Sequence, residues 1–225
     1  MQIDSKQFLN DGYAIIPECI PPDMLDQLRE SFATLVERQK AIWAREAQPD
    51  DPPGGVWETS GQPRLSYDQV VDESTADTID FTLHANTMGV SRQLMCSEDA
   101  ATVCFFLMCS PVKDCGPASW HRDIHPVDQA PLTGLQRDLR ENAPGVIQWN
   151  VPLYDDSVLW VVPGSHRRPN TQAENEQLLA DRTVPLPSSI PVELKAGDGV
   201  CYTNMILHWG SDYSTKLRRT IPFAL

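Results

Sequence analysis

The sequence predicts a mainly β protein, an antiparallel sandwich or barrel preceded by helices. After residue 100, short runs of β-branched and aromatic residues are separated by turn residues, which favours antiparallel strands over βαβ units. Before residue 100, apolar residues recur at helical spacing. The 225 residues, 41% of them hydrophobic, can bury a substantial core without disulfides. We expect a single domain over 1–225, with helical support in 1–100 and a β core in 101–225.

The first 43 residues predict a helix, a strand and a longer helix. Residues 6–10 (KQFLN) form the short helix, which ends at the turn Asp11-Gly12, and residues 13–17 (YAIIP) have the composition of a strand. Two prolines open the long helix, where a missing backbone amide costs little. This helix has one apolar face and needs a sheet on which to bury it. The members of that face are Met24, Leu25, Leu28, Phe32, Leu35 and Val36.

Three segments connect or interrupt these elements. Residues 47–65 are rich in proline, glycine and acidic residues and predict a loop or lid. A second helix is expected at 84–97. The polar segment 127–144 breaks the later β pattern like an inserted loop that can carry a helical turn. Long loops of this kind in compact domains often cover functional sites.

Six segments after residue 100 have the composition of strands. Turn sequences separate them, among them Pro163-Gly164 and 195–199 (KAGDG). The segments are 102–108, 145–153, 158–162, 190–194, 199–209 and 218–225. We expect them to form the sheets of the β core.

The charge balance excludes several classes of partner. With 18 Lys plus Arg against 31 Asp plus Glu, the net charge of -13 repels phosphate backbones and anionic lipids.

No apolar run approaches the length of a membrane helix, and the first residues lack the apolar region of a signal peptide. The six cysteines form no C-x-x-C pair. We expect a cytoplasmic protein that binds neither nucleic acid nor membrane; the sequence does not predict its oligomeric state.

Residues 119–126 (SWHRDIHP) contain two of the five histidines and an aspartate. In an extended segment His121 and Asp123 point to the same side and Arg122 to the other. An H-x-D pair alone is weak evidence, because a polar turn can also contain it. His208, near the end of a late strand segment, supplies a second imidazole. Two histidines and one carboxylate form the facial triad of non-haem Fe(II) oxygenases.

An arginine near the second histidine strengthens this hypothesis. The triad leaves three positions that can take two oxygen atoms of a 2-oxo acid and then dioxygen. A planar guanidinium is the natural partner of the acid's distal carboxylate, and Arg218 and Arg219 follow His208 by 10 and 11 residues. Gln148 and Asn150 share one face of their strand. Either amide can hydrogen-bond the co-substrate or simply satisfy polar groups of the sheet.

The remaining candidates have more ordinary interpretations. His125 is expected to be a polar residue at the exit of the motif, with a contact to a metal ligand as the alternative. His166 is expected in a turn and His84 at the start of a helix. Four tryptophans lie beside or between the motifs, and core packing explains most of them. One or two are expected to line the pocket. These four are Trp120, Trp149, Trp160 and Trp209.

Five motifs occur in order along the chain: FLNDGYAIIP, WHRD, VVPGSHRR (161–168), AGD (196–198) and HWGS followed by LRRTI. This set resembles the phytanoyl-CoA dioxygenase family of Fe(II)- and 2-oxoglutarate-dependent oxygenases over most of the chain. The resemblance implies a double-stranded β-helix (jelly roll, cupin-like) with N-terminal helices packed on its outer sheet. Members of the family commonly continue beyond the last strand, whereas this chain ends at Leu225.

By position, the resemblance implies that His121, Asp123 and His208 bind iron and that an arginine at the start of the last strand anchors 2-oxoglutarate. Counting from the histidine favours Arg219. The pattern of the family's last strand favours Arg218, which we prefer.

The resemblance also implies an activity. It is a dioxygenase that uses Fe(II), 2-oxoglutarate and dioxygen to hydroxylate a C–H bond of a small molecule, with release of succinate and CO2. The alternative is a catalytically lapsed or 2-oxo-acid-independent cupin-like metal-binding protein. Succinate formation that depends on 2-oxoglutarate would separate the two. The substrate is not predicted, because family members act on acyl-CoA thioesters, amino-acid derivatives and secondary metabolites.

Overall fold

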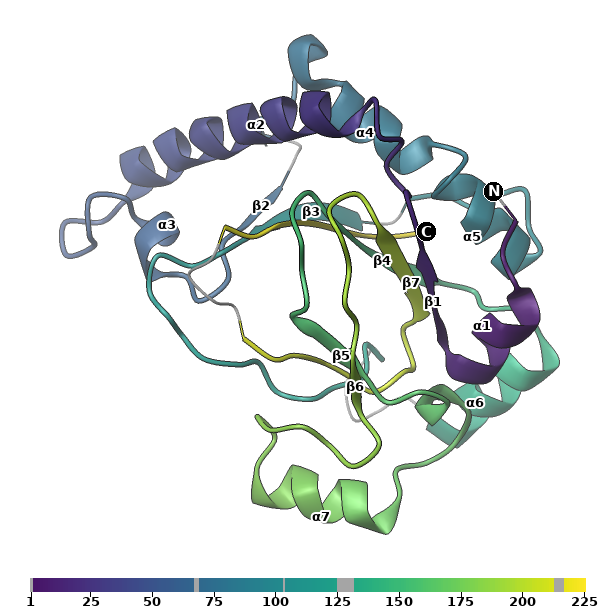
Figure 1. The fold of residues 1–225 in the computed structure, drawn as a ribbon. Helices are drawn as coiled ribbons and strands as arrows, with labels where there is room; N and C mark the ends of the chain where they lie inside the picture. The colour runs from purple at the N-terminus through teal and green to yellow at the C-terminus, as the bar shows by residue number, and fades with distance from the viewer. Residues whose placement is uncertain (1, 67–68, 103, 125–131, 213–216) are drawn as a thin grey trace.

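Two antiparallel sheets form the centre of the protein in the computed structural model, which describes residues 2–66, 69–102, 104–124, 132–212 and 217–225 (Figure 1). In these residues the larger sheet has the strand order β1-β7-β4-β9-β3-β2 and the smaller has the order β6-β5-β8. The strands are β1 (Tyr13–Ile16), β2 (Arg64–Ser66), β3 (Cys104–Cys109), β4 (Ile147–Pro152), β5 (Leu159–Val161), β6 (Ile190–Pro191), β7 (Gly199–Thr203), β8 (His208–Gly210) and β9 (Arg219–Ala224). The antiparallel architecture agrees with the prediction from the sequence.

Helices cover one face of the larger sheet. In Figure 1, α2, α4 and α5 lie along that face, and α7 lies beyond the smaller sheet. The helices are α1 (Ser5–Asp11), α2 (Leu25–Glu46), α3 (Val56–Thr59), α4 (Asp77–Asp80), α5 (Met88–Met95), α6 (Leu132–Glu141) and α7 (Gln172–Ala180), with 3-10 turns η2 (Glu73–Thr75), η3 (Phe81–Leu83) and η4 (Ser165–Arg167). Among the described residues, none of these helices combines the length and the hydropathy that spanning a membrane requires.

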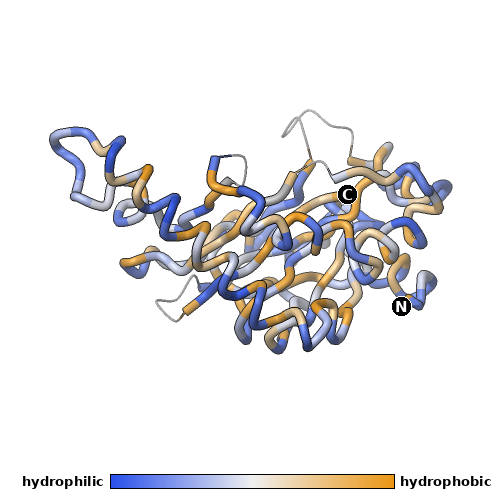
Figure 2. The backbone as a smooth tube through the Cα atoms, turned by 90° about the horizontal axis from the view of Figure 1, so that it is seen from above, coloured by the Kyte–Doolittle hydropathy of each residue, from blue (hydrophilic) through white to orange (hydrophobic). Residues whose placement is uncertain are grey.

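The alternation of side chains along β4 and β9 decides what faces the helices. Trp149 stacks on Phe223 with ring centroids 5.7 Å apart, and both belong to the core that α2 covers with Phe32 and Leu35. The apolar face predicted for α2 is therefore buried on the sheet. Figure 2 shows hydrophobic residues concentrated at the centre and a largely hydrophilic loop projecting after α2. The residues that alternate with Trp149 on β4 and with Phe223 on β9 point to the opposite face of the sheet, away from the helices.

The N-terminal half contains more regular structure than the sequence predicts. Residues 47–65 are not a loop throughout, because they contain α3 and the first residues of β2. The second helix begins at Met88, and His84 ends η3 instead of starting a helix. The preceding turns α4 and η3 contain threonines whose hydroxyl groups donate to backbone carbonyls, so β-branched residues are accommodated there.

Two further helices lie in the C-terminal half. Residues 132–141 of the predicted polar loop form α6. Helix α7 is absent from the prediction, although Thr171 and Glu174 form a capping box at its start. Its apolar residues do not follow helical spacing, so periodicity gave no signal.

The segment 199–209, predicted as one strand, is two strands in different sheets. β7 lies in the larger sheet between β1 and β4, whereas β8 pairs with β5 in the smaller sheet. A turn at 204–207 separates them. The chain therefore crosses from one sheet to the other, and His208 lies at the start of the second strand.

Gly12 joins the first helix to the turn that contains His166. It ends α1 with a φ of 84°, a left-handed conformation that favours glycine. His166 Nε2 donates to the carbonyl of Leu9 at 3.0 Å, and a Cβ at position 12 would collide with the His166 ring. His166 thus ties η4 to the C-terminal end of α1, which agrees with the structural role expected from the sequence.

Gly12→Ala is expected to lower the free energy of unfolding by about 3 kcal/mol, because left-handed strain and overpacking add. Urea denaturation measures the loss. Gly145→Ala is the control: a Cβ at position 145 would meet no neighbouring atom within 4 Å, and a change below about 0.5 kcal/mol is expected. Equal effects at the two positions would contradict the packing argument.

Candidate metal centre

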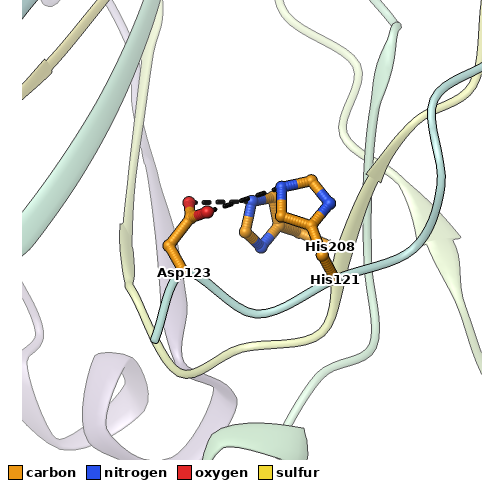
Figure 3. Close-up of side chains that lie close together, drawn as sticks. All are labelled: His121, Asp123 and His208. Carbon is orange, nitrogen blue, oxygen red and sulfur yellow. Dashed lines mark ion pairs between the residues drawn. The ribbon is translucent and has the colours of Figure 1, made fainter. Parts of the chain in front are cut away.

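His121, Asp123 and His208 are brought together by a contact between two distant segments (Figure 3). His208 begins β8, and the backbone of His121 pairs with it through reciprocal hydrogen bonds of 3.1 and 3.0 Å. The amide of Asp123 donates to the carbonyl of Asn204 at 2.8 Å. The strand predicted for the H-x-D segment is thus a single bridge, which nevertheless turns both side chains to one side.

The three side chains converge with the spacing of a metal site. His208 Nε2 lies 3.2 Å from Asp123 Oδ2, and His121 Nε2 lies 3.5 Å from Asp123 Oδ1. One possible ligand atom from each residue lies within 4.8 Å of the other two. The imidazole centroids are 4.2 Å apart. A single cation can therefore contact all three residues.

Backbone carbonyls fix the tautomer of both histidines. Nδ1 of His121 lies 2.8 Å from the carbonyl of Ser119, and Nδ1 of His208 lies 3.0 Å from that of Ile206. A carbonyl oxygen only accepts, so each Nδ1 carries the proton. In the neutral ring Nε2 then presents its lone pair toward the other ligands. This arrangement orients histidines at metal sites.

Asp123 is held as a carboxylate. Gln148 Nε2 donates to Asp123 Oδ2 at 2.7 Å. Burial alone would raise the pKa of Asp123, but the adjacent His208 ring and the hydrogen bond from Gln148 hold that pKa below its ordinary value. For His121, burial and the neighbouring His208 lower the pKa, which favours the neutral ring. Both effects favour the protonation states that metal ligands need.

The site opens toward solvent on one side. The side chain of His208 is 7% exposed, that of Asp123 29% and that of His121 47%. Trp120 and Trp209 flank the two histidines in sequence and stack on each other, with centroids 5.4 Å apart. They pack in a separate apolar cluster. Of the four tryptophans singled out in the sequence, Trp149 alone borders the cavity of the site, but its ring faces the helices, where Nε1 donates to Ser91.

The triad lines a cavity of about 200 Å³. Arg218, Gln148 and Asn150 line the same cavity, whereas Arg219 is not among its lining residues. The guanidinium of Arg219 lies 5.7 Å from the ring centre of Trp57, near the helices. Arg218 directly precedes β9 and Arg219 begins it, and the period-two alternation of extended chain explains why neighbouring arginines face opposite sides of the sheet.

Arg218 is buried in a polar group that also includes Asp156 and Thr220. Its Nε donates to Asp156 Oδ2 at 2.7 Å, and Thr220 Oγ1 donates to the same oxygen at 2.6 Å. Sequence reasoning missed Thr220 and Asp156. Thr220 could have been found from the sequence, because its spacing from Arg218 places both side chains on one face of a strand. Asp156 is far away in the chain and gave no signal.

The other polar candidates have distinct environments. Asn150 Nδ2 donates to the hydroxyl of Tyr202 at 3.4 Å, and burial raises the pKa of Tyr202. Arg64 of the edge strand β2 also lines the cavity and donates to Gln62. Neither Tyr202 nor Arg64 was singled out in the sequence. His125 lies outside the described residues.

Comparisons with known proteins agree on the family and the fold. Residues 8–221 match the phytanoyl-CoA dioxygenase family. EctD from S. alaskensis, solved with 2-oxoglutarate and 5-hydroxyectoine, has a TM-score of 0.68 at 16% identity over 98% of this chain and 73% of its own. AviO1 from Streptomyces viridochromogenes Tue57 has a TM-score of 0.62 at 22% identity over 98% and 91% of the two chains.

A third structure is the epimerase SnoN from nogalamycin biosynthesis, solved with Fe3+, alpha ketoglutarate and nogalamycin RO. Its TM-score is 0.63 at 16% identity over 98% of this chain and 81% of its own. No curated protein sequence gives a significant match. At these identities the solved structures establish a shared fold.

Proposed function

The chain belongs to the phytanoyl-CoA dioxygenase family, and from this premise we propose that it is an Fe(II)- and 2-oxoglutarate-dependent dioxygenase that hydroxylates a C–H bond of a small molecule. Succinate and CO2 are the other products. The match of residues 8–221 to the family model confirms the resemblance seen in the sequence. The fold shared with EctD and SnoN supports the finer assignment of the two sheets to one double-stranded β-helix domain.

Iron fits the donor set of His121, Asp123 and His208. Two imidazole nitrogens and one carboxylate are the ligands of the facial triad, and both histidines already present Nε2. Gln148 would hold the carboxylate in place through its hydrogen bond. When bound, iron supplies the redox chemistry by which dioxygen is activated. The chain's own residues orient the ligands and shape the cavity.

Arg218 is the candidate anchor for 2-oxoglutarate, with Thr220 beside it. The observation that carries the proposal is that Arg218 and the triad line one cavity. A guanidinium there can pair with the distal carboxylate of a 2-oxo acid whose other end reaches the metal. Gln148 donates to Asp123 and Asn150 donates to Tyr202, so the hydrogen bonds of both amides are made to residues that line the cavity.

The reaction type is the finer part of the proposal. EctD was solved with 5-hydroxyectoine, whereas SnoN is an epimerase, so the fold supports more than one outcome with small molecules. One observation favours the alternative, a metal-binding protein that does not use a 2-oxo acid: Arg218 is already paired with Asp156. Binding of 2-oxoglutarate therefore has to be tested first.

The test is an anaerobic titration of the metal-free protein with Fe(II) and then with 2-oxoglutarate. A visible metal-to-ligand charge-transfer band is expected, because the 2-oxo acid would chelate ferrous iron. The Zn(II)-loaded protein is the control and should give no band. Admission of oxygen should then yield succinate only when 2-oxoglutarate is present. Iron binding without a band would favour the alternative.

A further inference from the structure

A carboxylate of the protein already occupies the candidate co-substrate anchor. Asp156 Oδ2 accepts from Arg218 Nε at 2.7 Å and from Thr220 Oγ1 at 2.6 Å, and the side chains of Arg218 and Asp156 are 9% and 5% exposed. The other oxygen, Oδ1, accepts from the amide of Val158 at 2.8 Å. Arg218, which lines the cavity, and Thr220 beside it therefore both donate to Asp156.

The distal carboxylate of 2-oxoglutarate has the same chemistry as the side chain of Asp156. If Arg218 holds the co-substrate, two carboxylates bind the same guanidinium, and their negative charges repel each other because both lie next to it. Asp156 also balances the charge of Arg218, which reduces the attraction for a second anion. The structure thus predicts weaker binding of a 2-oxo diacid than an uncontested arginine would give.

We propose that Asp156 is a built-in competitor of the co-substrate, which lowers the affinity of the site for 2-oxoglutarate by holding Arg218 and Thr220. This inference rests on the proposed function. It assigns to Asp156 a role in setting co-substrate affinity, distinct from binding the metal.

The surroundings give the displaced carboxylate a place to go. Asp156 and Arg218 also line a second, larger cavity of about 790 Å³, whose wall includes Lys195. The backbone of Asp156 is fixed by paired hydrogen bonds of 3.0 and 2.9 Å with Leu194. Rotation of the side chain alone would turn the carboxylate into this cavity, which has room for water to hydrate it, so that it is not buried without a partner.

Asp156→Asn separates competition from positioning. Affinities are measured in the Fe(II)-loaded protein without oxygen, with 2-oxoglutarate and with 2-oxovalerate, which has the same carbon chain but no distal carboxylate. Removing the competing charge is expected to lower the Kd for 2-oxoglutarate about tenfold and to leave that for 2-oxovalerate within about twofold. Asp155→Asn is the matched control: it removes the same charge one residue away, where Asp155 accepts only from the amide of Ala196 among the described contacts.

An unchanged or weaker affinity of Asp156→Asn for 2-oxoglutarate would overturn the proposal, because Asp156 would then only position Arg218. If this variant does not fold, the wild type still decides. An uncontested arginine should favour 2-oxoglutarate over 2-oxovalerate by about 100-fold. A ratio below about 30 supports competition and a higher ratio refutes it. Absence of a charge-transfer band with either acid in the wild type would instead reject the proposed function.

Discussion

Asp123→Ala is expected to abolish iron-dependent turnover of 2-oxoglutarate. The substitution removes the only carboxylate of the triad and, with it, the group that Gln148 and His208 hold in place. Loss of a ligand should exceed the roughly 10- to 100-fold effect of losing an outer partner of a metal site. The measurements are succinate formation and the rise in Tm on adding Fe(II), and both should vanish.

The fold should survive this change, because Asp123 is 29% exposed and removal of its charge leaves no buried cation behind. His121→Ala, on the more exposed side of the site, should give the same result. Asp50→Ala, in the projecting loop after α2, is the control and should retain the metal-dependent rise in Tm. Normal turnover by Asp123→Ala would refute the assignment of the triad.

Arg218→Ala is expected to raise the Kd for 2-oxoglutarate by about 20-fold, less than the roughly 100-fold contribution of an uncontested guanidinium, because Asp156 competes for Arg218. Arg219→Ala should change it less than about threefold, because Arg219 lies over Trp57 and does not line the cavity. The charge-transfer band reports both affinities.

The free energy of unfolding has to be measured as well, because Arg218→Ala removes the cation of a buried ion pair. The expected cost is about 1 to 3 kcal/mol, below the roughly 3 to 5 kcal/mol of a fully buried broken pair, because Asp156 keeps its hydrogen bonds from Thr220 and Val158 and can turn toward water in the second cavity. Arg218→Lys keeps the charge but lacks the planar fork. It should fold and weaken 2-oxoglutarate about tenfold. If Arg219→Ala weakens binding and both Arg218 variants do not, the anchor has been assigned to the wrong arginine.

The errors in the predicted elements arise because local sequence patterns report which face of an element is buried but not where that element lies in the fold. Periodicity located α2 and the apolar strands because one face of each is buried. It missed α7, whose start is marked only by a capping box, and it placed a loop over α6. It also merged β7 and β8, since both are apolar and the turn between them contains neither glycine nor proline. Local composition does not tell which sheet a strand joins.

The sequence alone predicted the donor types of the candidate site. The spacing of His121 and Asp123, a later histidine and a following arginine pair specify donor types, and these depend only on residue identity. Tertiary structure decided which of the arginines shares the cavity with the triad, because the register of β9 against β4 sets the face of each residue. It also brought Asp156 onto Arg218 across 62 residues of sequence. Contacts of that range depend on how strands pair, which local patterns do not encode.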